Sequence, residues 1–274
     1  MTRKFSLVHL TYINWNPAEM IYIASLTGFD CVSVRTICQG LPGEKNHDIT
    51  GNNALFKATK QALADTGLSI NDIELAKIDS GTTDIRKYEC HLEAAASLGV
   101  KNVITNIWVG DSNFYTEKFC ELCDIAKQYG ITVNLEFVTW AKVTSLKAAR
   151  KLIESASRAN AAILLDTLHF HRSRVTLDEL KECPKNMFRI VHLCDAPSFI
   201  PDDEKSLIHT GRAERFYPGD GEIDIAGIMR LLDEEITVGI EVPNIKAVEV
   251  IGATEHARRC LEKTKRYLKD NAFL

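Results

Sequence analysis

The feature that most constrains this 274-residue chain is a regular alternation of short apolar segments with longer amphipathic ones. The predicted strands are residues 5–10, 31–36, 70–78, 102–108, 132–137, 162–166, 189–194 and 237–242. The predicted helices are residues 17–27, 53–66, 84–98, 115–129, 145–158, 177–181, 223–234 and 246–269. Most of these strands are rich in Val, Ile and Leu without clean polar alternation, which is typical of parallel strands covered by helices on both faces.

Three of the predicted helices end at a glycine that directly precedes an apolar segment, namely Gly67, Gly99 and Gly130. Glycine at this place is a common helix stop in αβ loops. Eight strand–helix units without a linker predict a single (β/α)8 TIM barrel domain over residues 1–274. An open doubly wound sheet is the alternative, but no G-x-G-x-x-G motif follows the first strand to support its dinucleotide-binding form.

Composition excludes several classes of protein. Hydrophobic residues make up 45% of the chain and charged residues 26%, which excludes a disordered chain. A net charge of -4 argues against binding nucleic acid. The apolar runs are shorter than the roughly 20 residues of a membrane span, and no secretory segment is recognised at the N-terminus. We therefore expect a cytoplasmic protein that binds neither nucleic acid nor membrane.

Ionisable residues occupy the ends of four consecutive predicted strands, and these are Glu136, Asp166, His192 and Glu241. In a barrel, the carboxyl ends of all strands lie at one face, where active sites are found. Three unpaired carboxylates would be costly there, and a divalent cation would offset that cost. The sequence therefore predicts one metal ion, with Mn²⁺ preferred and Mg²⁺, Co²⁺ or Zn²⁺ as alternatives. The alternative interpretation is that each of these residues forms its own salt bridge.

Other residues near the predicted strand ends are candidates for binding a substrate. Trp15, Trp108 and Trp140 each follow a predicted strand and would form an aromatic wall for a sugar ring, or else belong to the core. Arg212 and Arg215 lie in a long predicted loop, residues 195–221, and would bind an anionic substrate or pair with acidic neighbours.

Lys142, after the fifth predicted strand, is a further candidate for contacting an anion. Asp195 is expected to orient a metal ligand. His9 either lines the mouth of the predicted barrel or is a buried structural residue. His47, in the predicted loop of residues 37–52, is expected at the surface.

The motifs around these residues resemble the xylose isomerase-like TIM barrels. The quoted matches are Leu135-Glu136-Phe137, Asp166-Thr167-Leu168-His169, His192-Leu193-Cys194-Asp195, Gly239-Ile240-Glu241-Val242-Pro243 and the segment 218–224. The resemblance implies that Glu136, Asp166, His192 and Glu241 are the metal ligands and that His169 contacts the substrate. Two departures, Ser198 and Val138, are at positions that carry Arg in ketose 3-epimerases and His in dehydroshikimate dehydratases.

The reaction shared within this family is proton abstraction next to a carbonyl, with Glu136 and Glu241 as the expected catalytic acid–base residues. We expect an isomerase or epimerase of a small polyhydroxylated carbonyl compound such as a sugar, sugar phosphate or keto-polyol. The alternative is a dehydratase of a keto-cyclitol or dehydroshikimate-like compound. A phosphodiesterase resembling AP endonucleases and a non-catalytic binding module are further alternatives. Barrels of this family often pair, so a homo-oligomer is compatible with the sequence.

Overall fold

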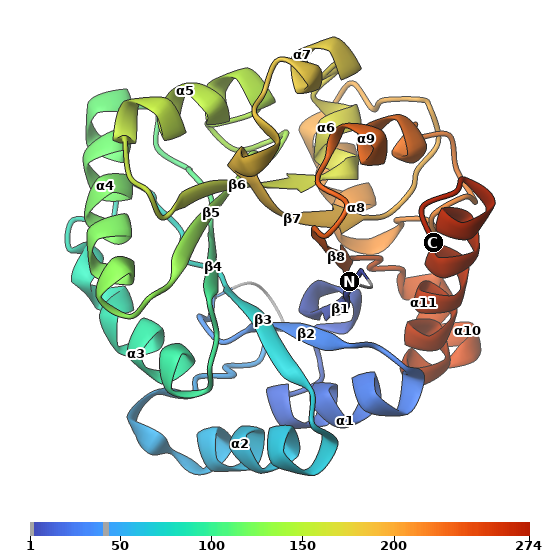
Figure 1. Cartoon of the computed structure of the whole chain (residues 1–274), viewed down its shortest axis with the longest axis horizontal. Coiled ribbons are helices and arrows are strands. Elements are labelled where there is room, and N and C mark those ends of the chain that lie inside the picture. Colours follow the sequence, from blue (N-terminus) through green and yellow to red (C-terminus); the bar gives the residue numbers. More distant parts are fainter. Residues whose placement is uncertain (1–2, 41–43) are drawn as a thin grey trace.

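A computed structural model, which describes residues 3–40 and 44–274, shows a closed barrel of parallel strands in the order β1 to β8 (Figure 1). The strands are β1 Phe5–Val8, β2 Cys31–Arg35, β3 Ser69–Glu74, β4 Asn102–Thr105, β5 Thr132–Glu136, β6 Ala161–Asp166, β7 Phe188–Leu193 and β8 Thr237–Ile240. Every strand pairs with its neighbour in the sequence, and β1 pairs with β8. The predicted (β/α)8 TIM barrel is confirmed.

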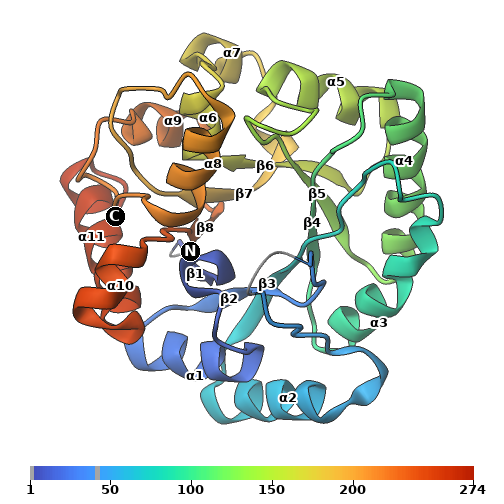
Figure 2. The same ribbon diagram turned by 180° about the vertical axis from the view of Figure 1, so that it is seen from behind.

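Helices surround the barrel, as both views show (Figures 1 and 2). The α-helices are α1 Pro17–Thr27, α2 Ala54–Thr66, α3 Glu89–Ser97, α4 Ser112–Gln128, α5 Leu146–Ala156, α6 Thr167–Arg172, α7 Leu177–Lys181, α8 Glu204–Ala213, α9 Ile225–Leu231, α10 Ile245–Ile251 and α11 Ala253–Asp270. Short 3₁₀ helices are η1 His9–Tyr12, η2 Thr50–Asn52, η3 Ile85–Tyr88 and η4 Lys185–Met187. No helix in the described part of the chain is long and apolar enough to cross a membrane.

Local sequence signals set the helix ends. Asn16 and Glu19 form a capping box at the start of α1, where Pro17 occupies the first helical position. Gly67 ends α2 in the left-handed region at φ 71°, which a residue with a side chain rarely adopts. Gly28, Gly99 and Gly130 adopt the same region after α1, α3 and α4, where the chain turns toward the next strand.

Two layers of apolar residues stabilise the barrel. The larger one packs the helices against the outer faces of the strands. A smaller cluster consists of Leu75, Ile104, Leu164 and Ile190. Ile104, Leu164 and Ile190 each lie two positions before a residue at, near or just beyond the carboxyl end of their strand. Because alternate residues of a strand point to the same face, side chains of this cluster share the barrel's inner face with the strand-end residues. This inner layer forms a floor beneath the mouth of the barrel.

Several element predictions were wrong: β4 ends at Thr105 rather than at residue 108, for example, and α6 was not predicted. Residues 246–269 form two helices rather than one, because Gly252 at φ 79° interrupts them between α10 and α11. Helix α8 lies inside the segment 195–221 that was predicted as a loop, and Asp203 caps its start. Strand β3 ends at Glu74, four residues before the predicted end. In the predicted loop of residues 37–52, residues 41–43 lie outside the described part.

Candidate functional site

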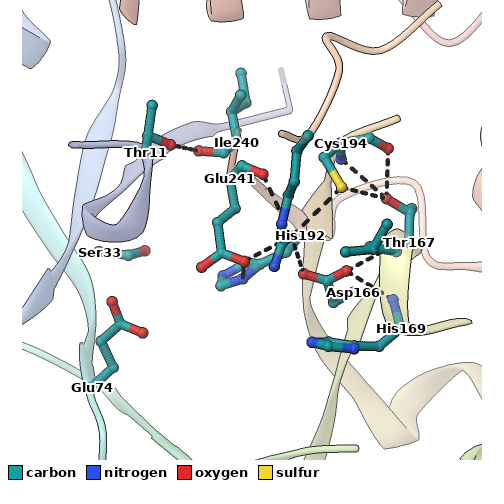
Figure 3. A network of polar contacts seen from close by, with 12 residues as sticks. Thr11, Ser33, Glu74, Asp166, Thr167, His169, His192, Cys194, Ile240 and Glu241 are labelled. Carbon is teal, nitrogen blue, oxygen red and sulfur yellow. Dashed lines mark hydrogen bonds and ion pairs between the residues drawn. The ribbon is translucent and has the colours of Figure 1, made fainter. Parts of the chain in front are cut away.

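Four side chains from neighbouring strands meet at the carboxyl end of the barrel. Glu136 and Asp166 are the last residues of β5 and β6, His192 lies near the end of β7, and Glu241 directly follows β8. One ligand atom from each of the four lies within 4.8 Å of the others. Figure 3 shows Asp166, His192 and Glu241 pointing toward one another. The strand-end residues that the sequence singled out therefore share one site.

A glycine makes room for the histidine of this site. In the ladder between β7 and β8, His192 is paired with Gly239. A Cβ atom at Gly239 would lie 2.5 Å from Cδ2 of His192, which is closer than such atoms approach in proteins. The absence of a side chain at Gly239 thus lets the imidazole occupy the barrel interior beside Glu241, whose Oε2 lies 3.8 Å from Nδ1 of His192.

The donor atoms of this site fit a divalent cation. Three carboxylates and one imidazole provide oxygen and nitrogen ligands suited to Mn²⁺, Mg²⁺, Co²⁺ or Zn²⁺. Both ring nitrogens of His192 are buried and have no hydrogen-bond partner within the described chain. Buried polar atoms without a partner are uncommon, and a metal ion would satisfy one of these nitrogens.

Arg215 is the counter-ion of this cluster. Its Nη1 lies 2.6 Å from Oδ2 of Asp166 and 2.9 Å from Oε2 of Glu241. Its Nε donates to the carbonyl of Gly211 at 2.7 Å. The sequence predicted Arg215 as a substrate ligand without placing it against the carboxylates, because the two partners are 49 and 26 positions away along the chain.

Burial and neighbouring charges shift the protonation of the site in opposite directions. Burial, followed by repulsion from Glu241 and Asp166, raises the pKa of Glu136 to about 8. Burial alone would lower the pKa of His192, but contact with Glu241 outweighs it and raises this pKa to about 9. Burial likewise opposes ionisation of Glu241, yet the charge of Arg215 lowers the pKa of that carboxyl far below its usual range. Glu136 is therefore ready to hold a proton near neutral pH, whereas Glu241 is not.

A cavity of about 240 Å³ opens above these residues. Its described lining is Leu10, Arg35, Gln39, Glu74, Leu75, Lys77, Asn106, Trp108, Glu136, Val138, Trp140, His169, Gly211, Arg212, Arg215 and Glu241. Five of the seven residues predicted to bind a substrate are in this set: Trp108, Trp140, His169, Arg212 and Arg215. Trp15 and Lys142 are not in it. A larger cavity of about 1050 Å³ lies along α8 and contains none of the four ligand-type side chains among its described lining.

His169 is fixed by contacts on several sides. Its backbone N–H donates to Oδ1 of Asp166, which caps α6. Its Nδ1 lies 3.3 Å from the backbone N–H of Thr139, which donates to it, and its ring stands edge-on to Trp140 at 4.8 Å between ring centroids. Because Nδ1 accepts a hydrogen bond, the neutral ring carries its proton on Nε2. Burial lowers the pKa of His169 to about 4, so this neutral form is the expected one near pH 7.

Three charged residues of the cavity were missed from the sequence, namely Arg35, Glu74 and Lys77. Arg35 ends β2 and Glu74 ends β3, and the two form an ion pair of 3.2 Å. Each is a charged residue at the end of an apolar run, which is the same signal that identified the residues of β5 to β8. The overlong prediction for β3 put Glu74 in mid-strand and hid this signal.

The structure corrects two further expectations. Asp195 does not contact the ligand set: its carboxylate accepts hydrogen bonds from the backbone N–H groups of Ala196, Gly219 and Ile223, and so shapes the turn before α9. His47 was expected at the surface but is 5% exposed, because its ring stacks on His9 at 5.2 Å between centroids. His9 itself is buried, with Nδ1 accepting from the backbone N–H of Arg35. His9 is therefore structural.

Comparisons with known proteins agree with this fold. A family model described as xylose isomerase-like TIM barrel matches residues 21–264. An inosose isomerase of Bacillus subtilis (strain 168) is 27% identical over 160 residues, which are 55% of each chain, so the match spans about half the length of that relative. A 3-dehydroshikimate dehydratase of Pseudomonas putida is 23% identical over 66% of this chain and 31% of its own length. A crystal structure of IOLI protein with a binding zinc atom superposes with a TM-score of 0.80 at 21% identity, covering 98% of this chain and 99% of that one.

Proposed function

The chain belongs to the xylose isomerase-like TIM barrel family, and from this premise we propose that it is a divalent-metal-dependent isomerase or epimerase of a small polyhydroxylated carbonyl compound. The observation that carries the proposal is the convergence of Glu136, Asp166, His192 and Glu241 within 4.8 Å, with Glu136 and Glu241 lining a cavity. The inosose isomerase relative and the zinc-binding structural neighbour support it.

In this proposal the four converging side chains hold the ion, and Mn²⁺ is the first candidate. When bound, the ion supplies Lewis-acid polarisation of a substrate carbonyl, which acidifies the neighbouring C–H bond. Arg215 pairs with Asp166 and Glu241 and so holds both carboxylates in place for binding a cation.

Glu136 and Glu241 are the proposed acid–base residues. Both line the cavity, and they come from β5 and from the end of β8, so they reach a substrate from different sides. Without the ion, burial raises the pKa of Glu136 to about 8. A bound cation would favour the ionised carboxylate, which is the form that can accept a proton from carbon. Removal of a proton by one glutamate and its return by the other gives epimerisation when the proton returns to the same carbon, and isomerisation when it returns to the neighbouring carbon.

Other residues of the cavity bind and orient the substrate. The Nε2–H group of His169 is available to donate to a hydroxyl or carbonyl oxygen, because Nδ1 is held by Thr139. Trp108 and Trp140 offer aromatic surfaces to the C–H face of a sugar-like ring. Nε1 of Trp108 donates to Oδ1 of Asn106 at 2.6 Å, which fixes one of these rings.

A dehydratase is the second candidate, because the chain is also similar to a 3-dehydroshikimate dehydratase. The same proton abstraction followed by loss of a β-hydroxyl gives this reaction. An AP endonuclease-like phosphodiesterase, which would need a larger set of metal ligands, is less well supported: within residues 3–40 and 44–274, one cluster of His, Cys, Asp and Glu has ligand geometry.

The experiment is deuterium incorporation into inosose and 3-dehydroshikimate by the Mn²⁺-loaded protein in D₂O, followed by NMR. We expect deuterium at the carbon next to the carbonyl. The variant Glu136→Gln should lose at least about 100-fold in rate, since general acid–base groups contribute on the order of 10²–10⁴. Glu249→Gln, at an exposed position of α10, is the matched control. A rise in ultraviolet absorbance without deuterated starting ketone would favour the dehydratase, and turnover by Glu136→Gln at the control rate would refute the assigned role.

A further inference from the structure

The wall of the cavity formed by β2, β3 and α8 carries a second group of charged residues. Arg35 ends β2, Glu74 ends β3 and Arg212 lies on α8, and all three line the cavity. In the closed barrel, β2 and β3 lie across the ring from β6 and β7, which carry Asp166 and His192. Figure 3 shows Glu74 separate from the cluster of Asp166 and His192. The cavity therefore has two ends of different chemistry.

Arg35 is a buried guanidinium with unused hydrogen-bond donors. Its side chain is 9% exposed, and Nη2 donates to Oε2 of Glu74 at 3.2 Å. Its Nε is buried and has no hydrogen-bond partner in the described chain. A guanidinium has five N–H donors, and buried donors are normally satisfied. Arg35 is thus equipped to bind a further acceptor from the cavity.

The backbone around Arg35 is held in place. The N–H group of Arg35 donates to Nδ1 of the buried His9 at 2.7 Å. Nε2 of His9 contacts the carbonyl of Trp15 at 2.7 Å, so both ring nitrogens of His9 are engaged. Burial lowers the pKa of His9 to about 3, which keeps this ring neutral and able to accept from Arg35. The guanidinium is therefore presented from a fixed position.

Arg212 brings a second positive charge to the same end. Its side chain is exposed, and among the described residues no ion pair or hydrogen bond engages its guanidinium, unlike that of its neighbour Arg215. Partial burial and the nearby charge of Arg35 lower the pKa of Arg212, and the nearby carboxylate of Glu44 opposes this shift. Two guanidinium groups that face one cavity repel each other, and an anion between them would reverse the sign of that interaction.

We propose that the substrate carries an anionic oxyacid group, a carboxylate or a phosphate, at the end remote from the proposed metal, and that Arg35 and Arg212 bind this group. The inference rests on the proposed function for the other end of the molecule. A volume of about 240 Å³ is below the range typical of drug-sized ligands, which favours a compact sugar acid or sugar phosphate. Arg215 does not bind the anion in this proposal, because Asp166 and Glu241 already engage it.

The test uses three probes that share a carbon skeleton: D-glucose, D-glucuronate and D-glucose 6-phosphate. Binding to the Mn²⁺-loaded protein is followed by tryptophan fluorescence, since Trp108 and Trp140 line the cavity. We expect at least one anionic probe to bind 10-fold or more tightly than glucose, and the tighter of the two identifies the group as a carboxylate or a phosphate. In Arg212→Met the difference should fall to about 2-fold or less.

Arg189→Met is the matched control, because Arg189 is also exposed but lies near the start of β7, at the opposite end of the barrel. It should keep the full preference for the anion. A preference that survives in Arg212→Met, or three probes that bind equally or not at all, would overturn the proposal.

Repeating the titrations in EDTA separates this proposal from the proposed reaction. The preference for the anion depends on Arg35 and Arg212, so it should persist when the metal is removed. Failure of deuterium incorporation together with a retained preference would refute the reaction but keep the anion site. Deuterium incorporation without any preference for an anionic probe would keep the reaction but refute the anion site.

Discussion

Replacing Arg215 with methionine tests whether this guanidinium balances the negative charge of the carboxylates at the candidate metal site. The guanidinium contacts Asp166 at 2.6 Å and Glu241 at 2.9 Å, and the three side chains are 5% exposed or less. Removing one partner of a buried ion pair typically costs about 3–5 kcal/mol, because the remaining charge has no compensation. Methionine retains an apolar stem of similar length, so most of this loss reports charge rather than packing. We expect metal-free Arg215→Met to lose about 3–5 kcal/mol in its free energy of unfolding.

Urea unfolding in EDTA and in excess Mn²⁺ measures this loss. A bound cation supplies positive charge where the guanidinium was, so Mn²⁺ should stabilise Arg215→Met more than it stabilises the wild type. The control is Arg212→Met, whose exposed side chain should change stability by less than about 0.5 kcal/mol. The reasoning is refuted if Arg215→Met loses under about 1 kcal/mol in EDTA, or if the loss is the same with and without Mn²⁺.

Two further predictions concern stability. Burial lowers the pKa of His9 to about 3, below its usual 6.5, so on acidification the unfolded chain binds a proton before the folded chain does. The free energy of unfolding should therefore decrease as the pH falls from about 6.5, by up to about 1.4 kcal/mol per pH unit. Urea titrations between pH 7 and 5 should give a smaller pH slope for His9→Gln than for the wild type, and equal slopes would exclude His9 as the cause. Gly211→Ala would place a methyl group 2.4 Å from Cη2 of Trp140 and should cost about 1–3 kcal/mol of stability. Gly110→Ala, where no atom lies within 4 Å, is its control, and an equal effect of the two substitutions would mean that Trp140 moves aside without cost.

The convergence of the four ligand-type residues was predictable from sequence for a physical reason. Parallel strands of a barrel all end at the same face, so residues such as Glu136 and Asp166 at successive strand ends must approach one another. This deduction needs only the strand boundaries, and these were correct to within a residue or two for β5, β6 and β7. Where the predicted boundary was wrong, as in β3, the sequence did not identify Glu74 as a strand-end residue.

The roles of the arginines were not predictable in the same way. Arg212 and Arg215 are three positions apart, and the sequence predicted either that both would bind one anion or that they would pair with acidic neighbours. The structure separates them, because α8 ends at Ala213 and the chain then turns inward, which buries Arg215 against Asp166 and leaves Arg212 exposed beside Arg35. Helix α8 depends on its cap at Asp203 and on packing of Gly211 against Trp140, contacts that no local periodicity of this polar segment reveals.

The charges of the candidate metal site explain how the barrel interior can hold this site both with and without a bound ion. Without a metal ion, the pKa values of about 8 for Glu136 and about 9 for His192 leave both groups protonated at neutral pH. The negative charges of Asp166 and Glu241 are then matched by the positive charges of His192 and Arg215. Ligation requires the imidazole to be neutral and the carboxyl groups to be ionised, so a divalent ion takes the place of two protons. The five side chains and the ion together therefore carry the same net charge as the five side chains do without the ion.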